Sequence, residues 1–241
     1  LNGYYLTGDG GASDYGVYVK DYNSPIIKNG FIYDFGRGIY LENANSSVIE
    51  NNFFDTTGNI TLYGIISNNS YISTIFNNTI FVNSTVNDNE VNGIGISILD
   101  GFGNNNITNN SIEAHADWWD ISFATFDYSK GSAVWMKDTY DNYIYDNTYT
   151  VTAGSDSGYE KGESDGSRAI YFNTTGGKVS NNSIGGTFES TIGFMVDGVG
   201  DLEIKIYENS TFNTAGHGFD YGVILSAENV TLDLNGYYLE G

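Results

Sequence analysis

The sequence contains no cysteine, a single proline and few charged residues. Without cysteine there is neither a disulfide framework nor a thiolate metal site. Charged residues make up 16% of the chain, against roughly 25% in an average soluble domain. The polar surface must therefore come from uncharged side chains. No apolar run reaches the roughly 18 residues that a membrane-spanning helix needs.

Basic residues are scarcer still: 9 Lys and Arg face 30 Asp and Glu, for a formal net charge of −21. Binding of a phosphate backbone needs a basic patch, so nucleic acid is not an expected partner. The same shortage argues against insertion into an anionic membrane. The acidity fits a solvated, self-repelling surface, with divalent cation binding as the alternative. The chain begins with Leu1, and we expect a mature product or a piece of a longer protein.

What the chain has instead is Asn, Ser, Thr, 31 Gly, 20 Tyr and 14 Phe. Aromatic and β-branched residues favour strands, and Gly and Asn favour tight turns. A disordered chain would lack the aromatic residues. No segment shows a convincing helical periodicity, so we expect an all-β protein.

Two motifs repeat in phase along the chain. In the first, a small residue precedes an alternating apolar pattern, as expected of a short strand with one buried face. Its copies begin at Gly16, Gly38, Gly64, Gly95, Ala133, Ala169, Gly193 and Gly222. The second motif is an apolar residue, any residue, then Asn-Asn or Asn-Gly, or Asp-Asn in the copy at Ile144. Its copies begin at Ile27, Ile49, Ile75, Ile107, Ile144, Val179 and, in degenerate form, Ile206.

Such a unit cannot bury its apolar face alone, but stacked copies can, with strands pairing in parallel at about 4.8 Å. We therefore expect one domain over residues 1–241, a right-handed parallel β-helix of about eight coils with open ends and loop insertions. An antiparallel sandwich also has short strands and turns, but it does not predict two motifs in phase. We place the segments around Asp117-Trp118-Trp119-Asp120 and Gly154–Gly158 in loops.

The Asn-Asn pairs have two expected roles. The first Asn tolerates the left-handed turn and should face out, whereas the second should point inward and hydrogen-bond to its equivalents in neighbouring coils. The predicted structural ladder is Asn52, Asn78, Asn110, Asn147 and Asn182.

The combined pattern, apolar-x-Asn-Asn-x-apolar and then Gly-Ile-x-apolar, resembles the right-handed parallel β-helix repeat of pectin-lyase-like and NosD-like proteins. It is most similar to tandem versions in archaeal cell-surface and S-layer-type proteins. The resemblance covers nearly the whole chain. It implies the fold, but the same coil carries lyases, hydrolases, adhesins and inert stalks.

The two ends of the chain also match each other. Residues 1–8 and 234–241 are identical at seven of eight positions, at an offset of 233 residues. We expect the chain to be one period of a tandem array, or a subunit that stacks end to end with identical units.

Eleven N-x-[ST] sequons mark candidate glycosylation sites. They start at Asn45, Asn59, Asn68, Asn77, Asn83, Asn106, Asn109, Asn173, Asn181, Asn209 and Asn229. Asn77, Asn109, Asn181 and Asn209 fall in the second motif, at an expected solvent-facing corner. Asn106 and Asn109 are too close for us to expect both to be filled.

Other chemical signals are weak. Gly216-His217-Gly218 resembles the Gly-His-Gly of polygalacturonase-type hydrolases, with Asp197 and Asp201 upstream. That family's other motifs are missing, and a histidine beside a coil glycine is the simpler interpretation. His115 with Asp117 and Asp120 is poor grounds for a metal site.

The acidic, Gly-rich segments 9–14 and 156–165 would suit Ca²⁺, but they fit neither known Ca²⁺ loop spacing and a solvated turn is the favoured explanation. We expect no catalytic residue, no metal site and no cofactor. The aromatic stretch from Trp118 to Tyr149 fits either packing between coils or a sugar-binding face. It includes Trp119, Tyr140, Tyr143 and Tyr145.

Three functions follow from these patterns. The expected one is a structural, heavily N-glycosylated fibre or surface-layer module outside the cell, without enzymatic activity. The first alternative is a carbohydrate-binding adhesin stalk, which requires a solvent-facing row of aromatic residues. The second is a polysaccharide lyase or hydrolase, which requires carboxylates within about 10 Å of each other in a groove.

Overall fold

The computed structural model describes the backbone in many segments separated by short gaps. They are residues 1–58, 62–86, 91–99, 103–118, 129–153, 168–180, 183–188, 192–198, 202–205, 210–211, 213–214, 221–227, 230–233 and 239–240. Side chains are described for residues 1–58, 62–84, 93–99, 103–115, 142–144 and 146–148. Within these residues the chain forms strands and no helix, and hence no helix that could cross a membrane.

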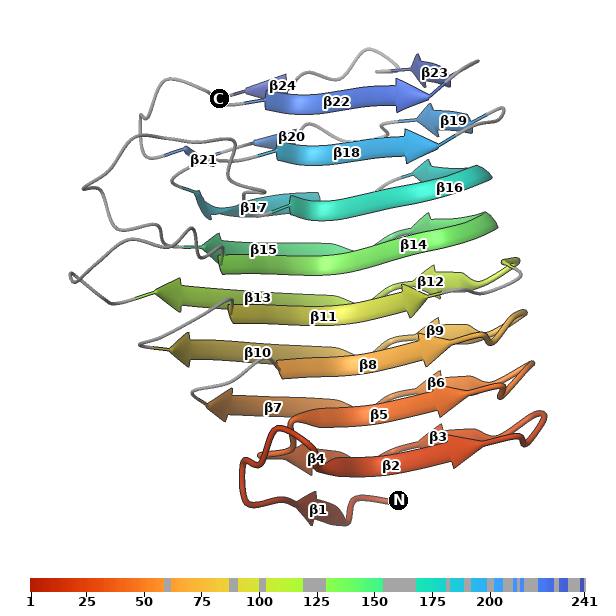
Figure 1. Ribbon diagram of the computed structural model, residues 1–241, viewed down its shortest axis with the longest axis vertical. Helices are drawn as coiled ribbons and strands as arrows, with labels where there is room; N and C mark the ends of the chain where they lie inside the picture. The colour runs from red at the N-terminus through yellow and green to blue at the C-terminus, as the bar shows by residue number, and fades with distance from the viewer. Residues whose placement is uncertain are drawn as a thin grey trace.

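The strands stack in three rows, and every recorded pairing along a row is parallel (Figure 1). The first row is β2 (Tyr15–Lys20), β5 (Arg37–Glu42), β8 (Leu62–Asn68), β11 (Val91–Leu99), β14 (Ser129–Tyr145), β16 (Arg168–Ser180), β18 (Ile192–Gly198) and β22 (Tyr221–Ala227). Each of these eight strands carries one copy of the first sequence motif.

The second row is β3 (Ile26–Lys28), β6 (Val48–Glu50), β9 (Thr74–Phe76), β12 (Asn106–Thr108), the carboxyl halves of β14 and β16, then β19 (Leu202–Lys205) and β23 (Val230–Asp233). The third is β1 (Tyr5–Thr7), β4 (Phe31–Tyr33), β7 (Phe53–Gly58), β10 (Thr79–Val86), β13 (Ser111–Trp118), β15 (Thr148–Ala153), β17 (Ser183–Phe188) and β21 (Asn213–Thr214). A small separate sheet pairs β20 (Ser210–Thr211) with β24 (Leu239–Glu240). The predicted right-handed parallel β-helix is confirmed.

The core is a set of aliphatic columns, because parallel pairing places equivalent residues above one another. In the second row Ile27, Ile49, Ile75, Ile107 and Ile144 are in register and buried. Burying one such side chain contributes roughly 1.5–3 kcal/mol. The stacked coils thus bury what a single coil would leave in water.

The small residue that opens the first motif has a packing role. A Cβ at Gly38 would lie 2.6 Å from the carbonyl oxygen of Gly64 and 2.8 Å from a ring carbon of Phe54. Gly16 and Gly64 meet the carbonyl oxygen of the next coil at the same distance. Only a very small residue fits where the first row passes so close to the next coil.

One loop expectation needs correction. Asp117 and Trp118 are not in a loop but form the last residues of β13, in register with Thr85 and Val86 of β10. The ladder between the two strands continues past the apolar pattern, because backbone pairing does not depend on which side chains face out. Trp119 and Asp120, and all of residues 154–158, lie outside the described residues.

Candidate functional site

The corner between the second and third rows carries the predicted asparagine ladder. Asn52, Asn78, Asn110 and Asn147 are all buried. The Nδ2 atom of Asn78 donates to Oδ1 of Asn110 at 3.0 Å, and Nδ2 of Asn110 donates to Oδ1 of Asn147 at 3.0 Å. Each side chain therefore supplies both donors and acceptors to its neighbours, as a buried amide must. Asn182 lies outside the described residues.

The residue before each ladder position is exposed and has a left-handed conformation, and the partly exposed Asn29 takes the same conformation before Gly30 in the first coil. Asn29, Asn51, Asn77, Asn109 and Asp146 have φ between 52° and 56°. Asn and Asp tolerate this region better than other non-glycine residues. On the surface, Nδ2 of Asn77 donates to Oδ1 of Asn51 at 2.6 Å, and Nδ2 of Asn109 donates to Oδ1 of Asn77 at 3.0 Å. We call this row of five residues the outer corner row.

The structure separates the predicted sequons by exposure. Asn77 and Asn109 are exposed, whereas Asn45, Asn68, Asn83 and Asn106 are only partly exposed. Asn173 lies in β16, with its side chain outside the described set. Asn59, Asn181, Asn209 and Asn229 also lie outside the described residues.

The predicted chemistry-bearing residues are not gathered into one site in the described part of the chain. His115 forms a 2.7 Å contact with Glu113, and its ring centroid lies 5.5 Å from that of Phe81 with the two ring planes tilted by 53°. The residues with described side chains contain no group of three His, Asp or Glu able to hold a metal ion. Asp197 lies in β18 without a described side chain, and Asp120, Asp201, His217 and residues 156–165 are outside the described residues.

The predicted Ca²⁺ loop at residues 9–14 is described. Asp9 accepts a hydrogen bond from the backbone N–H of Gly11 at 3.1 Å. The Asp9 and Asp14 carboxyl groups interact with each other, and this interaction lowers the pKa of Asp9 and raises the pKa of Asp14.

A shallow groove of about 410 Å³ crosses the first coils beside the outer corner row. Its wall includes Asn29, Asn51 and Asn77, and its aromatic side is formed by Phe31 and Phe53. Thr79 lines the end nearest the third coil, and none of the lining residues is charged. We call this feature the Phe–Asn groove.

The aromatic side of the Phe–Asn groove belongs to a larger cluster on the outer face of the third row. Tyr5, Phe31 and Phe53 are in register on β1, β4 and β7. The ring centroids of Phe31 lie 6.1 Å from those of both Tyr5 and Phe53. Tyr33 lies 5.9 Å from Phe53. Tyr5 is 70% exposed and Phe31 36% exposed, so these rings face solvent rather than the core.

Sequence reasoning missed this groove, although a signal for it is present. The residue after the Asn-Gly or Asn-Asn pair is Phe31 and Phe53 in the first two copies, but Thr79, Ser111 and Thr148 in the next three. Because that position begins the third row and faces out, the change from aromatic to hydroxyl residues marks where the aromatic surface ends. The aromatic stretch predicted from the sequence, Trp118 to Tyr149, is not part of this groove. Within that stretch, Tyr143 has a described side chain, which is 45% exposed.

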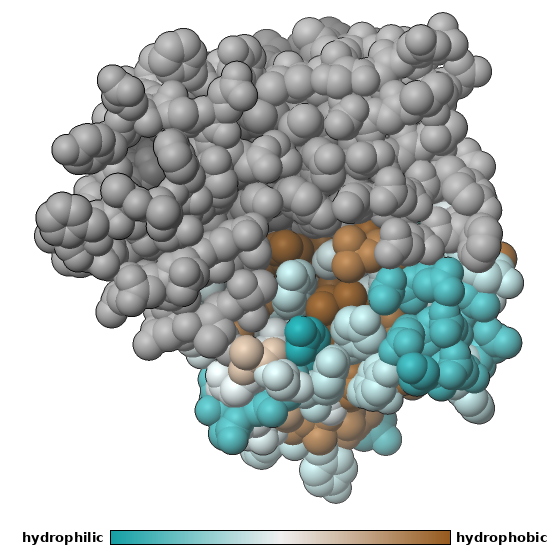
Figure 2. Space-filling view, viewed as in Figure 1, coloured by the Kyte–Doolittle hydropathy of each residue, from teal (hydrophilic) through white to brown (hydrophobic). Residues whose placement is uncertain are grey.

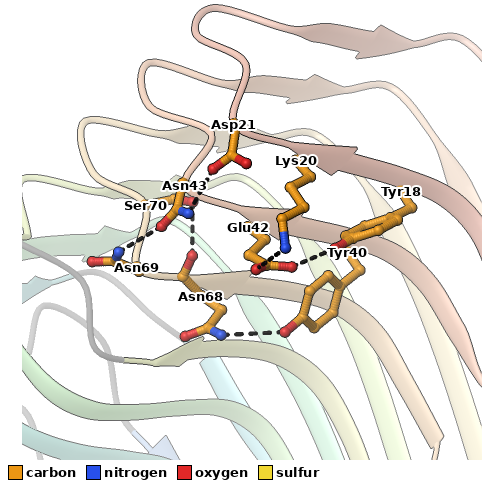
Figure 3. A network of polar contacts seen from close by, with 9 residues as sticks. All are labelled: Tyr18, Lys20, Asp21, Tyr40, Glu42, Asn43, Asn68, Asn69 and Ser70. Atoms are coloured by element: carbon orange, nitrogen blue, oxygen red, sulfur yellow. Dashed lines mark hydrogen bonds and ion pairs between the residues drawn. The ribbon is translucent and has the colours of Figure 1, made fainter.

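A second aromatic cluster lies on the first row. The rings of Tyr15, Tyr18 and Tyr40 pack at 5.1–5.5 Å, and the Arg37 guanidinium lies 5.2 Å from the centre of Tyr15. Figure 3 shows that the polar ends of this cluster are already engaged: Tyr18 donates to Glu42, and Asn68 donates to the Tyr40 hydroxyl at 3.2 Å.

Glu42 is the centre of that network. Its carboxylate accepts a hydrogen bond from Lys20 at 2.7 Å and another from the Tyr18 hydroxyl. Both hydrogen bonds lower the pKa of Glu42, and the one from Lys20 has the larger effect. Beyond it, Asn43 donates to Asp21 at 2.7 Å and Asn69 donates to Asn43 at 2.5 Å. Figure 2 shows hydrophilic residues gathered on this side of the molecule, where the turns after β2, β5 and β8 lie.

Besides Asp14, a second carboxyl group in the described part has its pKa raised by its surroundings. Asp55, on β7, is partly buried, and this desolvation raises its pKa, with repulsion from Asp34 as a smaller cause. Asp55 is in register with Tyr33 on one side and Phe81 on the other. It therefore sits on the same outer face as the aromatic cluster.

Comparison with known proteins supports the fold. The family described as "Right handed beta helix region" matches residues 7–148, which is more than half of the chain. No curated protein matches the sequence. A solved structure with a similar fold is the catalytic domain of a GH87 alpha-1,3-glucanase in complex with nigerose. It has 13% sequence identity and a TM-score of 0.44, over 91% of this chain and 50% of that one.

This comparison overturns one expectation. We expected the chain not to be an enzyme; that expectation is withdrawn, because the solved domain with a similar fold is a catalytic one and gives the expectation no support. The chain spans about half the length of that domain, and at such low identity the likeness concerns the fold alone. What the family match establishes is that this chain belongs to the right-handed β-helix family.

Proposed function

We propose that this protein binds an extended, neutral polysaccharide across its coils, in the Phe–Asn groove. The observation that carries the proposal is the combination of solvent-facing Phe31 and Phe53 with a row of amide side chains in one concave surface. Ligand sites are typically concave and largely apolar, with a few convergent polar groups. The aromatic rings offer apolar faces to sugar rings, and the amides offer donors and acceptors to hydroxyl groups.

Charge supports a neutral ligand. The chain has a net charge of −21, so an acidic polysaccharide would be repelled over the Debye length of about 10 Å at 0.1 M salt. The groove itself is lined by uncharged residues, so nothing there offsets the repulsion. A neutral chain meets no such barrier.

The direction of the groove supports a polymer. Asn29, Asn51 and Asn77 belong to three successive coils, and Phe31 and Phe53 to the first two. A chain of sugars that runs along the stack therefore meets equivalent groups repeatedly, at about 4.8 Å per coil. Repeated weak contacts of this kind favour long ligands over single sugars.

Affinity electrophoresis in gels that contain neutral or acidic polysaccharides tests the proposal. Retardation by at least one neutral polysaccharide, and by none of the acidic ones, is expected. Equal mobility in every gel, or retardation by acidic polymers alone, contradicts it. Release of reducing ends from the retarding polymer then separates the two sequence-based alternatives, since an enzyme shortens the bound chain and an adhesin does not.

The sequence-based expectation of a structural, end-to-end stacking module outside the cell remains a prediction. Binding of a neutral polysaccharide is compatible with it, because the groove occupies only one corner of the first coils.

A further inference from the structure

Five sequons, those of Asn45, Asn68, Asn77, Asn106 and Asn109, have both the asparagine and the hydroxyl residue described. We propose that, of these five, Asn77 and Asn109 carry N-linked glycans in the folded protein. This inference does not rest on the proposed polysaccharide binding, but the two meet at Asn77 and Thr79, which also line the Phe–Asn groove, so a glycan on Asn77 would occupy that end of the groove. It rests on the environment of both ends of each sequon: the asparagine that is modified, and the hydroxyl residue two positions later that a transferase must also recognise.

In two sequons both ends are open to solvent. Asn77 and Thr79 are exposed, and so are Asn109 and Ser111, while the residue between them points into the buried ladder. This alternation follows from the turn: the first asparagine takes the left-handed conformation, and the hydroxyl residue begins the outer face of the third row.

In three other sequons the hydroxyl residue is buried. Ser47 and Ser70 are fully buried, and Thr108 is 7% exposed. Two of their asparagines also form hydrogen bonds: Asn45 accepts one from the backbone N–H of Tyr71, and Asn68 donates one to the Tyr40 hydroxyl. At the Asn68 turn the exposed, left-handed residue is Asn69, one position too late to be the acceptor.

The hydrogen bonds of the outer corner row are compatible with the modification. The new bond joins Nδ2 to the anomeric carbon of the sugar. The bond that breaks joins that carbon to a phosphate oxygen of a lipid-linked glycan donor, and the phosphate leaves with the electron pair. Nδ2 passes one of its two protons to a base of the transferase and keeps the other. Each of the two asparagines donates only one recorded hydrogen bond through Nδ2, to Asn51 and to Asn77 respectively, so one N–H remains to keep it.

The backbone is equally unaffected. Removal of such a glycan by an amidase leaves Asp, and Asp146 already occupies the outer corner row with φ 56°. Asp at position 77 or 109 therefore fits the same turn. This gives a chemical label for occupied sites that does not depend on any variant folding.

The test is peptide-level mass spectrometry of the chain secreted from a host that performs N-glycosylation. Amidase treatment in H₂¹⁸O should convert Asn77, Asn109 or both to ¹⁸O-labelled Asp, with no label at Asn45, Asn68 or Asn106. Thr79→Ala and Ser111→Ala each remove one sequon without touching its asparagine, and together they should abolish glycopeptides from this corner. Thr108→Ala, which removes the Asn106 sequon, should leave the pattern unchanged. Label at Asn45, Asn68 or Asn106, or none at Asn77 and Asn109, overturns the proposal.

Discussion

Asn77 and Asn78 are neighbours in the sequence and lie in opposite environments. Asn77 is exposed in the outer corner row, and Asn78 is 1% exposed in the buried ladder. Nδ2 of Asn78 donates to the carbonyl oxygen of Ile49 at 2.9 Å, and its Oδ1 accepts from the N–H of Asn52 at 3.0 Å. The pair shows how one dipeptide both turns the chain and ties three coils together.

The first prediction compares the same substitution at these two positions. Asn78→Asp removes the buried donor and adds a buried charge, which should lower the free energy of unfolding by about 3–5 kcal/mol. Asn77→Asp keeps the left-handed turn and should change it by less than about 0.5 kcal/mol. Urea unfolding followed by circular dichroism measures both. Similar losses in the two variants would mean that the ladder does not hold the coils together.

A second prediction concerns Asp55. Its folded pKa is raised by burial, so the folded state holds the proton more tightly than the unfolded state. The protonated Asp55 carboxyl group therefore contributes to the free energy of unfolding at low pH. That contribution is lost as the pH rises from the ordinary pKa of aspartate through the raised pKa of Asp55. Asp55→Asn should raise the melting temperature at pH 7 and have little effect at pH 3, whereas Asp34→Asn should give a smaller gain. A lower melting temperature for Asp55→Asn at pH 7 would contradict this account.

A third prediction concerns the close approach at Gly38. Its substitution by Ala places a methyl group against the Gly64 carbonyl and Phe54, and should cost about 1–3 kcal/mol. Gly10→Ala is the comparison: Gly10 has φ 79° but nothing within 4 Å of an added Cβ, so only backbone strain of about 1 kcal/mol is expected. Thermal unfolding of both variants distinguishes packing from strain. An equal cost would mean that the first motif needs glycine for backbone reasons alone.

A fourth prediction follows from the 233-residue match between the chain ends. If units continue end to end, eight coils at about 4.8 Å give an axial repeat of roughly 40 Å. Electron microscopy of the native material measures that repeat. An isolated particle, or a filament whose repeat bears no relation to this length, would remove the basis for the proposed array.

The sequence predicted the fold well because the coil is a local pattern. The alternation around Ile39 and the Asn51-Asn52 pair each report a strand and a turn without long-range information. The Phe–Asn groove was not predicted, because Phe31 and Phe53 come together only through stacking of separate coils. The sequon motif likewise could not predict which asparagines are exposed. Asn68 and Asn77 match the motif equally, and only the geometry of their turns distinguishes them.

The most direct test of the proposed function is titration of the retarding neutral polysaccharide into the Phe31→Ala/Phe53→Ala variant by calorimetry. Loss of two stacked rings, each worth about 0.5–1.5 kcal/mol, should weaken binding roughly tenfold or more. Tyr22→Ala removes a ring that is 63% exposed outside the groove and should bind like the parent chain. Unchanged affinity in the double variant, or an equal loss in Tyr22→Ala, would contradict binding in the Phe–Asn groove.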